Sequence, residues 1–226
     1  MISIKNITKI YDEKTNPFHA LNDVNFDIEN GETVAVIGKS GSGKSTMMHI
    51  MSGLDHPTSG QVIIDGEELH KMKAREMDAF RATQMSFIFQ SFFIEANQTC
   101  FQNVILPLEI AKTAKAKRRK LVEEALTAVG LKEKINSLAN NLSGGQKQRL
   151  AIARAIVGRP KLIFADEPTG NLDSTTGDKI IELLFSLNKK LDCTLIIVTH
   201  DDDLAKLCDK QIKLKDGKVE SITESK

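Results

Sequence analysis

Short apolar runs separated by turn signals dominate the first third of the chain. Four of them have the β-branched and alternating character of strands: ISIKNITKIY (2–11), VNFDI (24–28), ETVAVIG (32–38) and QVIIDG (61–66). The run STMMHIMSGL, which starts at Ser45, has helix-forming apolar residues and stops near Gly53. The pattern therefore predicts several strands and, after the third, a loop and a helix.

The rest of the chain predicts a helical block between further strands. Residues 85–89 form another apolar strand candidate, and about 92–157 are rich in helical periodicity. The β-rich runs KLIFAD (161–166), TLIIVTH (194–200) and QIKLKDG (211–217) follow, with a helical pattern over 176–191. The first two of these runs are apolar throughout, which is typical of parallel strands buried on both faces.

Composition indicates a globular protein without bulk affinity for polyanions. Of its 226 residues, 41% are hydrophobic and 27% are charged, as expected for a packed core. The 31 Lys and Arg nearly balance the 30 Asp and Glu, so we expect no nucleic-acid partner. Three widely spaced cysteines fit neither a disulfide framework nor a zinc cluster, which favours reduced thiols.

No segment of the sequence is typical of export or of membrane insertion. The amino-terminal residues MISIKNITKIYDEK lack the long apolar stretch of a signal peptide. No window approaches the roughly 20 apolar residues that span a bilayer. We expect a chain that is not exported and that reaches a membrane only through another protein.

A glycine-rich segment directly follows the predicted strand 32–38. It reads GKSGSGKST (38–46) and contains the spacing of phosphate-binding loops, in which backbone N–H groups and a helix N-terminus surround phosphate oxygens. Lys44 is expected to reach the β- and γ-phosphates during catalysis, and the Ser45 hydroxyl to ligate Mg²⁺. The predicted nucleotide contacts here are Gly38, Lys39, Ser40, Gly41, Ser42, Gly43, Lys44, Ser45 and Thr46.

This loop alone is compatible with kinases, GTPases and ABC proteins. A second motif distinguishes between these classes of protein. Residues 142–149 read LSGGQKQR, which resembles the Leu-Ser-Gly-Gly-Gln signature of the ABC ATPases. Ser143 could cap the following helix, and capping is compatible with anion binding by the same N–H groups. The resemblance implies that Ser143, Gly144, Gly145 and Gln146 close over ATP held by a second subunit, in a head-to-tail homodimer.

Further family motifs match in order along nearly the whole chain. Gln90 follows the strand SFIF, where the family has a glutamine that senses Mg²⁺ and contacts the membrane partner. LIFADE (162–167) resembles the second phosphate-site motif, which assigns Asp166 to Mg²⁺ and Glu167 to the attacking water. A metal needs an anionic oxygen and the water needs an acceptor, so adjacent carboxylates can divide these tasks. Whether Glu167 accepts the proton fully or mainly positions the water stays open.

Three more residues receive roles from the resemblance. His200 follows the strand TLIIVT, where the family has a histidine that touches the γ-phosphate. Asp173 in GNLD resembles the dimer-contact loop, and Tyr11, the single tyrosine of the chain, lies where an aromatic ring stacks on adenine. The predicted catalytic residues are thus Lys44, Glu167 and His200.

The resemblance implies an α/β fold of the P-loop NTPase (RecA-like) type. We expect one ABC ATPase domain over 1–226. Its nucleotide-binding core and amino-terminal antiparallel β subdomain would span approximately 1–90 and 158–226, and an inserted α-helical subdomain with the signature approximately 91–157. Within the family, DEPTGNLDS (166–174) looks most like the ATPases of macrolide exporters, lipoprotein-release systems and antimicrobial-peptide-resistance transporters.

The expected function is the ATP-hydrolysing subunit of an ABC transporter. It would bind ATP and Mg²⁺, dimerise, and drive export or membrane extraction of a peptide, lipoprotein or drug-like cargo through a separate transmembrane permease. Its location would be the cytoplasmic side of the cell membrane. The segment SFFIEANQTCFQNV (91–104) departs from the branch's usual pattern where the family faces its partner. The alternative is a soluble ABC ATPase of DNA repair or translation.

Overall fold

A computed structural model of the chain describes residues 1–12 and 15–225. The chain divides into two units, Met1–Arg81 with Asp192–Lys226 and Ala82–Leu191. Within the described residues, no helix combines the length and apolar composition needed to cross a bilayer. The two units are described in turn.

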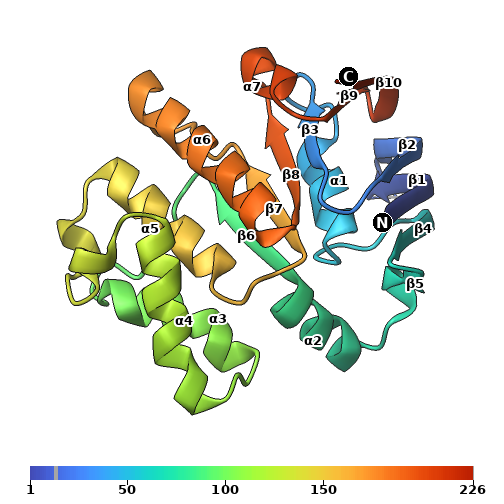
Figure 1. The fold of residues 1–226 in the computed structure, drawn as a ribbon. Coiled ribbons are helices and arrows are strands. Elements are labelled where there is room, and N and C mark those ends of the chain that lie inside the picture. The colour runs from blue at the N-terminus through green and yellow to red at the C-terminus, as the bar shows by residue number, and fades with distance from the viewer. Residues whose placement is uncertain (13–14, 226) are drawn as a thin grey trace. The chain divides into compact units, whose positions relative to one another are not determined.

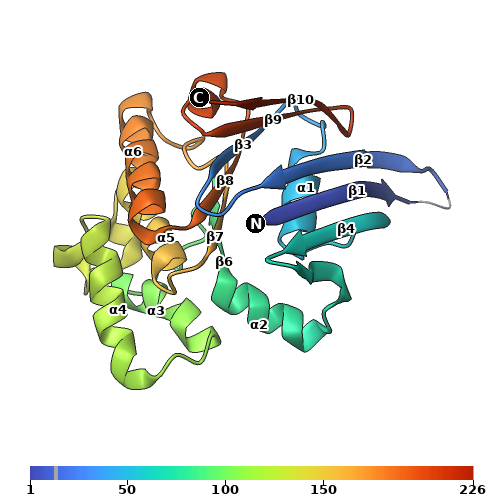
Figure 2. The same cartoon turned by 45° about the vertical axis from the view of Figure 1, so that its right-hand side comes forward.

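The first unit contains an antiparallel sheet with the strand order β2–β1–β4–β5 (Figure 2). Its strands are β1 (Ile2–Tyr11), β2 (Phe18–Ile28), β4 (Ser59–Ile64) and β5 (Glu67–Glu68). In β1, Ile2 and Ile4 are buried at a spacing of two, but the next buried isoleucine is Ile7. Asn6, with φ 52°, lies at the register shift between them. This bulge changes the phase of the strand and keeps Ile7 in the core.

The same unit contains strands that are buried on both faces. β3 (Thr33–Ile37) pairs in parallel with β8 (Thr194–Thr199) on one side and with β9 (Lys210–Lys215) on the other. β10 (Lys218–Glu224) pairs antiparallel with β9. Every residue of β3 and β8 is buried, as the apolar runs predict. The helices of this unit are α1 (Lys44–Met51), α7 (Asp202–Lys206) and the part of α2 (Ala74–Gln84) up to Arg81, with a 3₁₀ turn at Leu69–Lys71.

The second unit is mainly helical. β6 (Met85–Phe89) and β7 (Leu162–Asp166) form a parallel pair, and α5 (Gly144–Ile156) packs against β6. α5 also contacts α3 (Cys100–Ile110), α4 (Lys115–Ala128) and α6 (Ser174–Leu191), and Figure 1 shows α3, α4 and α5 gathered together. The 3₁₀ turns are Lys132–Lys134 and Ala139–Asn141.

Three elements were not expected from the sequence. α2 (Ala74–Gln84) has one buried side chain, α7 has five residues, and β10 is almost fully exposed. Each lacks the apolar periodicity on which sequence prediction depends. The strands around the phosphate loop and the helical block are confirmed, whereas the subdomain boundaries at 90 and 158 stay a prediction.

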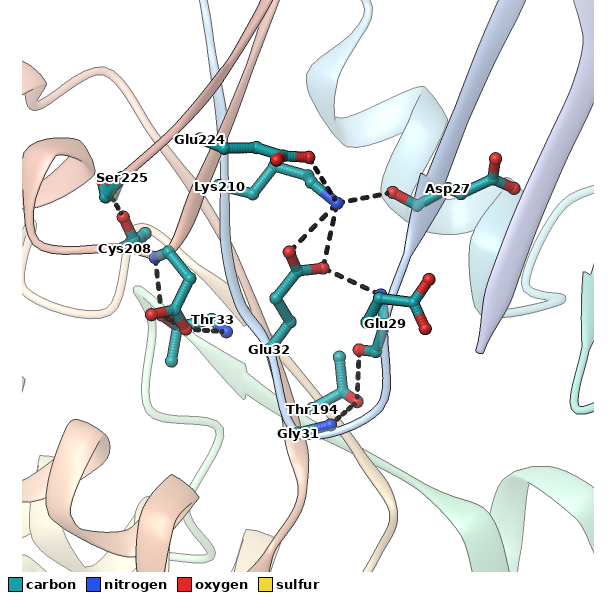
Figure 3. A network of polar contacts seen from close by, with 11 residues as sticks. Asp27, Glu29, Gly31, Glu32, Thr33, Thr194, Cys208, Lys210, Glu224 and Ser225 are labelled. Atoms are coloured by element: carbon teal, nitrogen blue, oxygen red, sulfur yellow. Dashed lines mark hydrogen bonds and ion pairs between the residues drawn. The ribbon is translucent and has the colours of Figure 1, made fainter.

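A buried lysine joins three parts of the first unit (Figure 3). The Lys210 ammonium lies 3.0 Å from Glu32 Oε1 and 3.5 Å from Glu224 Oε1, and it donates to the Asp27 carbonyl oxygen at 3.1 Å. Burial opposes its charge, but Glu32 and then Glu224 outweigh this effect and raise the pKa of Lys210. The network connects β9 to the end of β2, to the turn before β3 and to the last strand.

We expect Lys210→Met to lower the free energy of unfolding by about 3 kcal/mol, because it leaves the Glu32 carboxylate partly buried without its cation. Urea denaturation measures this change. The matched control is Lys213→Met, since Lys213 forms an ion pair with Glu220 at 2.7 Å but is 51% exposed. That variant should lose much less stability than Lys210→Met, because an ion pair exposed to solvent contributes little. Equal losses in both variants would contradict a special role for the buried network.

The three cysteines should be unreactive in the folded protein. All three are buried, and burial raises the pKa of Cys193 to about 11 and of Cys208 to about 12. The thiolate is the reactive form, so an aromatic disulfide reagent at neutral pH should label no thiol until denaturant is added. Rapid labelling of the native chain would show that these side chains become exposed.

Candidate functional site

The phosphate-loop segment of the first unit turns sharply between β3 and α1. Gly38 and Gly43 have φ of 151° and 101°, in the region that favours glycine. A Cβ at Gly38 would lie 2.3 Å from the Leu214 carbonyl oxygen, and one at Gly43 would lie 2.5 Å from the Ala20 carbonyl oxygen. These two glycines allow the loop to pass close against the backbones of β9 and β2.

The start of α1 has the properties of an anion site. Its N-cap residue Gly43 makes no side-chain cap, and the first turn contains no acidic residue. The first N–H groups of a helix have no intrahelical acceptor, and they attract anions. Lys44 Nζ donates to the carbonyl oxygens of Gly38 at 2.8 Å and Lys39 at 3.0 Å. The ammonium therefore lies against the loop, next to the positive end of the helix.

Two hydroxyls of the loop fit a ligand rich in oxygen atoms. Ser42 Oγ is buried and has no hydrogen-bond partner among the described residues. Ser45 is exposed in the first turn of α1. Beside the loop, a groove of about 460 Å³ is lined by 38–42, 213–216 and Glu220. The oxygen atoms of a bound phosphate chain would accept hydrogen bonds from these hydroxyls and from the N–H groups at the helix N-terminus.

His200 leaves the sheet beside the start of this loop. β3 and β8 are in register with Ile37 opposite Thr199, so Gly38 and His200 are the next residues on neighbouring strands. His200 is exposed. The following turn is held by Asp201, whose backbone N–H donates to Thr199 Oγ1 at 3.1 Å and whose carboxylate caps α7.

In the second unit, Gln90, Asp166 and Glu167 emerge from adjacent strand ends. Phe89 of β6 is opposite Asp166 of β7, so Gln90 and Glu167 follow at the same edge. Asn171 Nδ2 donates to the Gln90 carbonyl oxygen at 2.8 Å, and Gln90 Nε2 donates to Asn171 Oδ1 at 3.4 Å. Parallel pairing therefore brings the predicted metal and water ligands of this unit together.

Glu167 occupies an uncommon backbone conformation. Its φ is 46°, in the left-handed region that few residues other than glycine adopt. The chain after it is fixed because Gly170 N–H donates to the Glu167 carbonyl oxygen at 3.1 Å and Gln148 Nε2 donates to the Pro168 carbonyl oxygen. Such strain, held by its surroundings, is often found at functional sites. Asp166 and Glu167 thus leave β7 in different backbone conformations.

The signature motif begins α5 with a capping box. Ser143 Oγ accepts from the Gln146 N–H at 3.4 Å, and Gln146 Oε1 accepts from the Ser143 N–H at 3.0 Å. Ser143 and Gly144 are exposed. Capping by Ser143, which the sequence left open beside anion binding, therefore does occur, and the exposed start of the helix can still face a ligand.

Asp173 lies in the same groove as the signature. Its carboxylate accepts from the Thr176 N–H at 3.0 Å, and the hydrogen bonds from Thr176 lower the pKa of Asp173. A Cβ at Gly145 would lie 2.6 Å from Thr176 Cγ2, so the starts of α5 and α6 approach closely. The groove of about 600 Å³ is lined by Val129, Ser143, Gly144, Gly145, Gln146, Arg149, Asn171, Leu172, Asp173, Thr176, Lys179, Ile180 and Leu183.

Sequence reasoning missed the residues that support the site. Asn171 holds Gln90, Gln148 holds the turn after Glu167, and Thr176 packs against Gly145. Asn171 lies in GNLD and Gln148 lies in LSGGQKQR, so their places in recognised motifs could have identified them. Asp55 accepts a hydrogen bond from Tyr11, and no motif marks it.

The donor set fits Mg²⁺ together with a nucleotide. Among the described residues, no group of three or more His, Cys, Asp or Glu side chains could hold a metal. In the second unit, Gln90 and Asp166 offer an amide oxygen and a carboxylate, and in the first unit Ser45 offers a hydroxyl. Each is a hard oxygen ligand of the kind that Mg²⁺ prefers. Such a cation commonly takes its other ligands from phosphate oxygens and water.

Comparison with known proteins identifies related chains over nearly the full length. Residues 21–170 match the family model described as ABC transporter. The lipoprotein-releasing system ATP-binding protein LolD of Syntrophotalea carbinolica is 43% identical over 219 residues, covering 97% of this chain and 96% of that protein. The uncharacterized ABC transporter ATP-binding protein MJ1508 of Methanocaldococcus jannaschii is 44% identical over 222 residues, covering 98% and 99%.

A solved structure has the same fold. It is the dimeric structure of a post-hydrolysis state of the ATP-binding cassette MJ0796 bound to ADP and Pi. The TM-score is 0.88 at 41% identity, over 99% of this chain and 98% of that chain. The similarity confirms the α/β fold class, with its antiparallel sheet, parallel strands and helices.

The phosphate loop permits a matched test of its geometry. We expect Gly43→Ala to lower the free energy of unfolding without nucleotide by about 3 kcal/mol, because φ and the Ala20 carbonyl oxygen both oppose a Cβ. Gly41→Ala is the control, since its φ is 78° but a Cβ there would meet nothing within 4 Å; it should lose about 1 kcal/mol. Thermal unfolding compares the two, and equal losses would mean that the close approach at Gly43 is unimportant.

Proposed function

Because the chain belongs to the ABC transporter family, we propose that it works as a head-to-tail homodimer that powers transport through a separate transmembrane permease. The chain is the ATP-binding and ATP-hydrolysing cassette of such a transporter. The observation that carries the homodimer is the pair of helix starts suited to phosphate, at Gly43 and at Ser143. The dimeric structure of the MJ0796 cassette bound to ADP and Pi supports a dimer.

The residues of the first unit hold the triphosphate in this proposal. The loop 38–46 binds its oxygens through backbone N–H groups, and Lys44 neutralises charge on the β- and γ-phosphates. His200, next to the loop by strand register, contacts the γ-phosphate. Tyr11 stacks on the adenine.

The residues of the second unit supply the metal and water ligands. Asp166 and Gln90 of this unit would supply a carboxylate and an amide oxygen to Mg²⁺, and Ser45 of the phosphate loop would supply a hydroxyl. The cation would offset the charge that develops on the phosphates. Glu167 orients the attacking water and is the acceptor beside it. Ser143, Gly144, Gly145 and Gln146 contact the γ-phosphate bound by the other subunit, and Asp173 couples the two composite sites.

Transport requires a partner that crosses the membrane, since no helix of the described residues can do so. Exposed apolar side chains in the second unit suit such a partner, since Phe93, Leu106 and Ile110 are 65%, 45% and 61% exposed. Arg154 donates to the carbonyl oxygens of Phe92 and Phe93, which fixes the segment that carries Phe93. We place the chain at the cytoplasmic side of the cell membrane, held there by this contact.

Lipoproteins are the cargo class that the relatives favour. LolD is named for a lipoprotein-releasing system, and the run DEPTGNLDS resembles that branch. Export or membrane extraction of a lipoprotein, peptide or drug-like molecule is therefore the proposed work of the complex. The alternative of a soluble ATPase of DNA repair or translation is not supported by these relatives, and the net charge of +1 gives no general attraction to nucleic acid.

Glu167→Gln tests the composite-site mechanism. We expect turnover to fall by roughly 10²- to 10⁴-fold, because the acceptor beside the attacking water is lost, while ATP and Mg²⁺ convert the variant into a stable dimer. A phosphate-release assay and light scattering during size-exclusion chromatography measure both properties. Glu182→Gln, at an exposed carboxylate of α6, is the control. A monomer with unchanged turnover would refute the assignment of Glu167.

Phe93→Ser tests the contact with the permease. The native chain should co-purify in detergent with a multi-span membrane protein of its own cell. The variant should lose that protein but keep its affinity for ATP, because Phe93 is an exposed apolar side chain outside the phosphate loop. Leu207→Ser, which alters a side chain that is 62% exposed in the first unit, should still capture it. Retention by both variants would contradict the proposed contact.

A further inference from the structure

The single tyrosine of the chain belongs to a polar cluster outside the phosphate loop. The Tyr11 hydroxyl donates to Asp55 Oδ2 at 2.7 Å, and Lys9 Nζ donates to Asp55 Oδ1 at 2.8 Å. Lys9 and Tyr11 are two residues apart in β1, which puts them on the same face of the strand. The Lys9 ammonium lies 4.7 Å from the centroid of the Tyr11 ring, a cation–π distance.

These contacts fix the ring at both ends. The backbone of β1 holds its Cβ end, Asp55 holds its hydroxyl, and Lys9 covers one of its faces. The residue is nevertheless 37% exposed. A planar ligand can therefore stack on the face away from Lys9 without first ordering the side chain, which lowers the entropy cost of binding.

The cluster is itself firmly built. The side chains of Lys9 and Asp55 are 13% and 30% exposed. Lys9 also donates to the His56 carbonyl oxygen at 2.8 Å, and the His56 N–H donates to Asp55 Oδ1 at 2.7 Å. Neither Lys9 nor Asp55 can move without breaking a contact with the turn after α1.

The protonation states suit this arrangement. Burial opposes ionisation of Asp55, but hydrogen bonds from Lys9 and then Tyr11 outweigh it and hold the pKa of Asp55 below its usual value. Burial, followed by the bond to Asp55, raises the pKa of Tyr11, and a hydrogen bond with Thr46 at the end of the phosphate loop acts in the opposite direction. At neutral pH the phenol is thus a donor and Asp55 is an acceptor only.

We propose that Lys9 and Asp55 are positioning residues for the nucleotide base, which hold Tyr11 with one ring face under the Lys9 ammonium and its opposite face presented to adenine. This inference rests on the proposed role of Tyr11 in ATP binding. Asp55 acts through the Tyr11 hydroxyl and Lys9 acts through the ring face.

Ligand affinities test the proposal in the full chain. Asp55→Asn keeps an oxygen for Lys9 and His56 but replaces the acceptor of the Tyr11 hydroxyl, and Lys9→Met keeps the stem without the ammonium. Each should raise the Kd for ATP, measured by calorimetry, by roughly three- to tenfold. The Kd for tripolyphosphate, which has no base, should stay unchanged. Asp78→Asn, which alters an exposed ion pair with Arg81, is the control and should change neither value.

Fluorescence tests the Tyr11–Asp55 hydrogen bond directly. The chain has one tyrosine and no tryptophan, so its intrinsic emission comes from Tyr11 alone. A phenol bonded to a carboxylate emits weakly, because the excited hydroxyl transfers its proton readily to the acceptor. Emission should rise in Asp55→Asn and stay constant in Asp78→Asn. Unchanged emission in Asp55→Asn would overturn the proposed bond.

A double-mutant cycle separates this inference from the proposed function. Asp55→Asn should weaken ATP binding in the native background and have no further effect in Tyr11→Phe, because both changes remove the same hydrogen bond. Additive losses, or an unchanged Kd for ATP in both Asp55→Asn and Lys9→Met, would overturn the positioning role. Tyr11→Ala with unchanged ATP affinity would instead refute stacking by Tyr11, and native protein that binds neither ATP nor tripolyphosphate would refute the proposed function itself.

Discussion

Strands that are buried on both faces can present polar side chains only where they end, and this constraint arranges the site in each unit. In the first unit, β3 and β8 are buried throughout and end in register, so the phosphate loop and His200 leave the sheet together. In the second unit, the ends of β6 and β7 release Gln90, Asp166 and Glu167 side by side. Parallel pairing places these carboxyl ends at one edge of each ladder, which is where open α/β sheets bind ligands.

The backbone N–H groups at the N-termini of α1 and α5 are satisfied in different ways. At α1, left-handed Gly43 provides no side-chain cap, and Lys44 adds a positive charge beside the helix end. At α5, Ser143 and Gln146 form a capping box that satisfies part of the helix start within the chain. An uncapped start gains more from a bound anion than a capped one. This difference suits a loop that holds the triphosphate throughout and a signature that meets it only when two subunits close.

Several residues outside the proposed chemistry hold the site residues, or the backbone that carries them, in place. Gln148 and Gly170 hold the turn in which Glu167 has positive φ, and Asn171 holds Gln90. Lys210 ties β9, which flanks β3, to the turn before β3 and to the last strand. Lys9 and Asp55 have the same relation to Tyr11. Asn171, Lys9 and Asp55 contact residues that a ligand would touch, which keeps those residues in place before the ligand binds. Gln148, Gly170 and Lys210 instead hold the backbone that carries such residues.

The sequence by itself determined the parts that depend on local order: the strands around the phosphate loop, the helix after it, the helical block and the motifs from GKSGSGKST to LIFADE. Their signals are apolar periodicity and fixed spacing, which lie in contiguous residues. The phase change at Asn6, the positive φ of Glu167, the strand β10 and the contacts of Asp55, Asn171 and Lys210 were decided only by the tertiary structure. β10 pairs with its neighbour β9 across the turn at 216–217, but it is almost fully exposed and therefore has no apolar alternation. The contacts of Asp55, Asn171 and Lys210 depend on partners distant in the chain, and hydrogen-bond pairing between distant segments leaves no periodic trace in either segment.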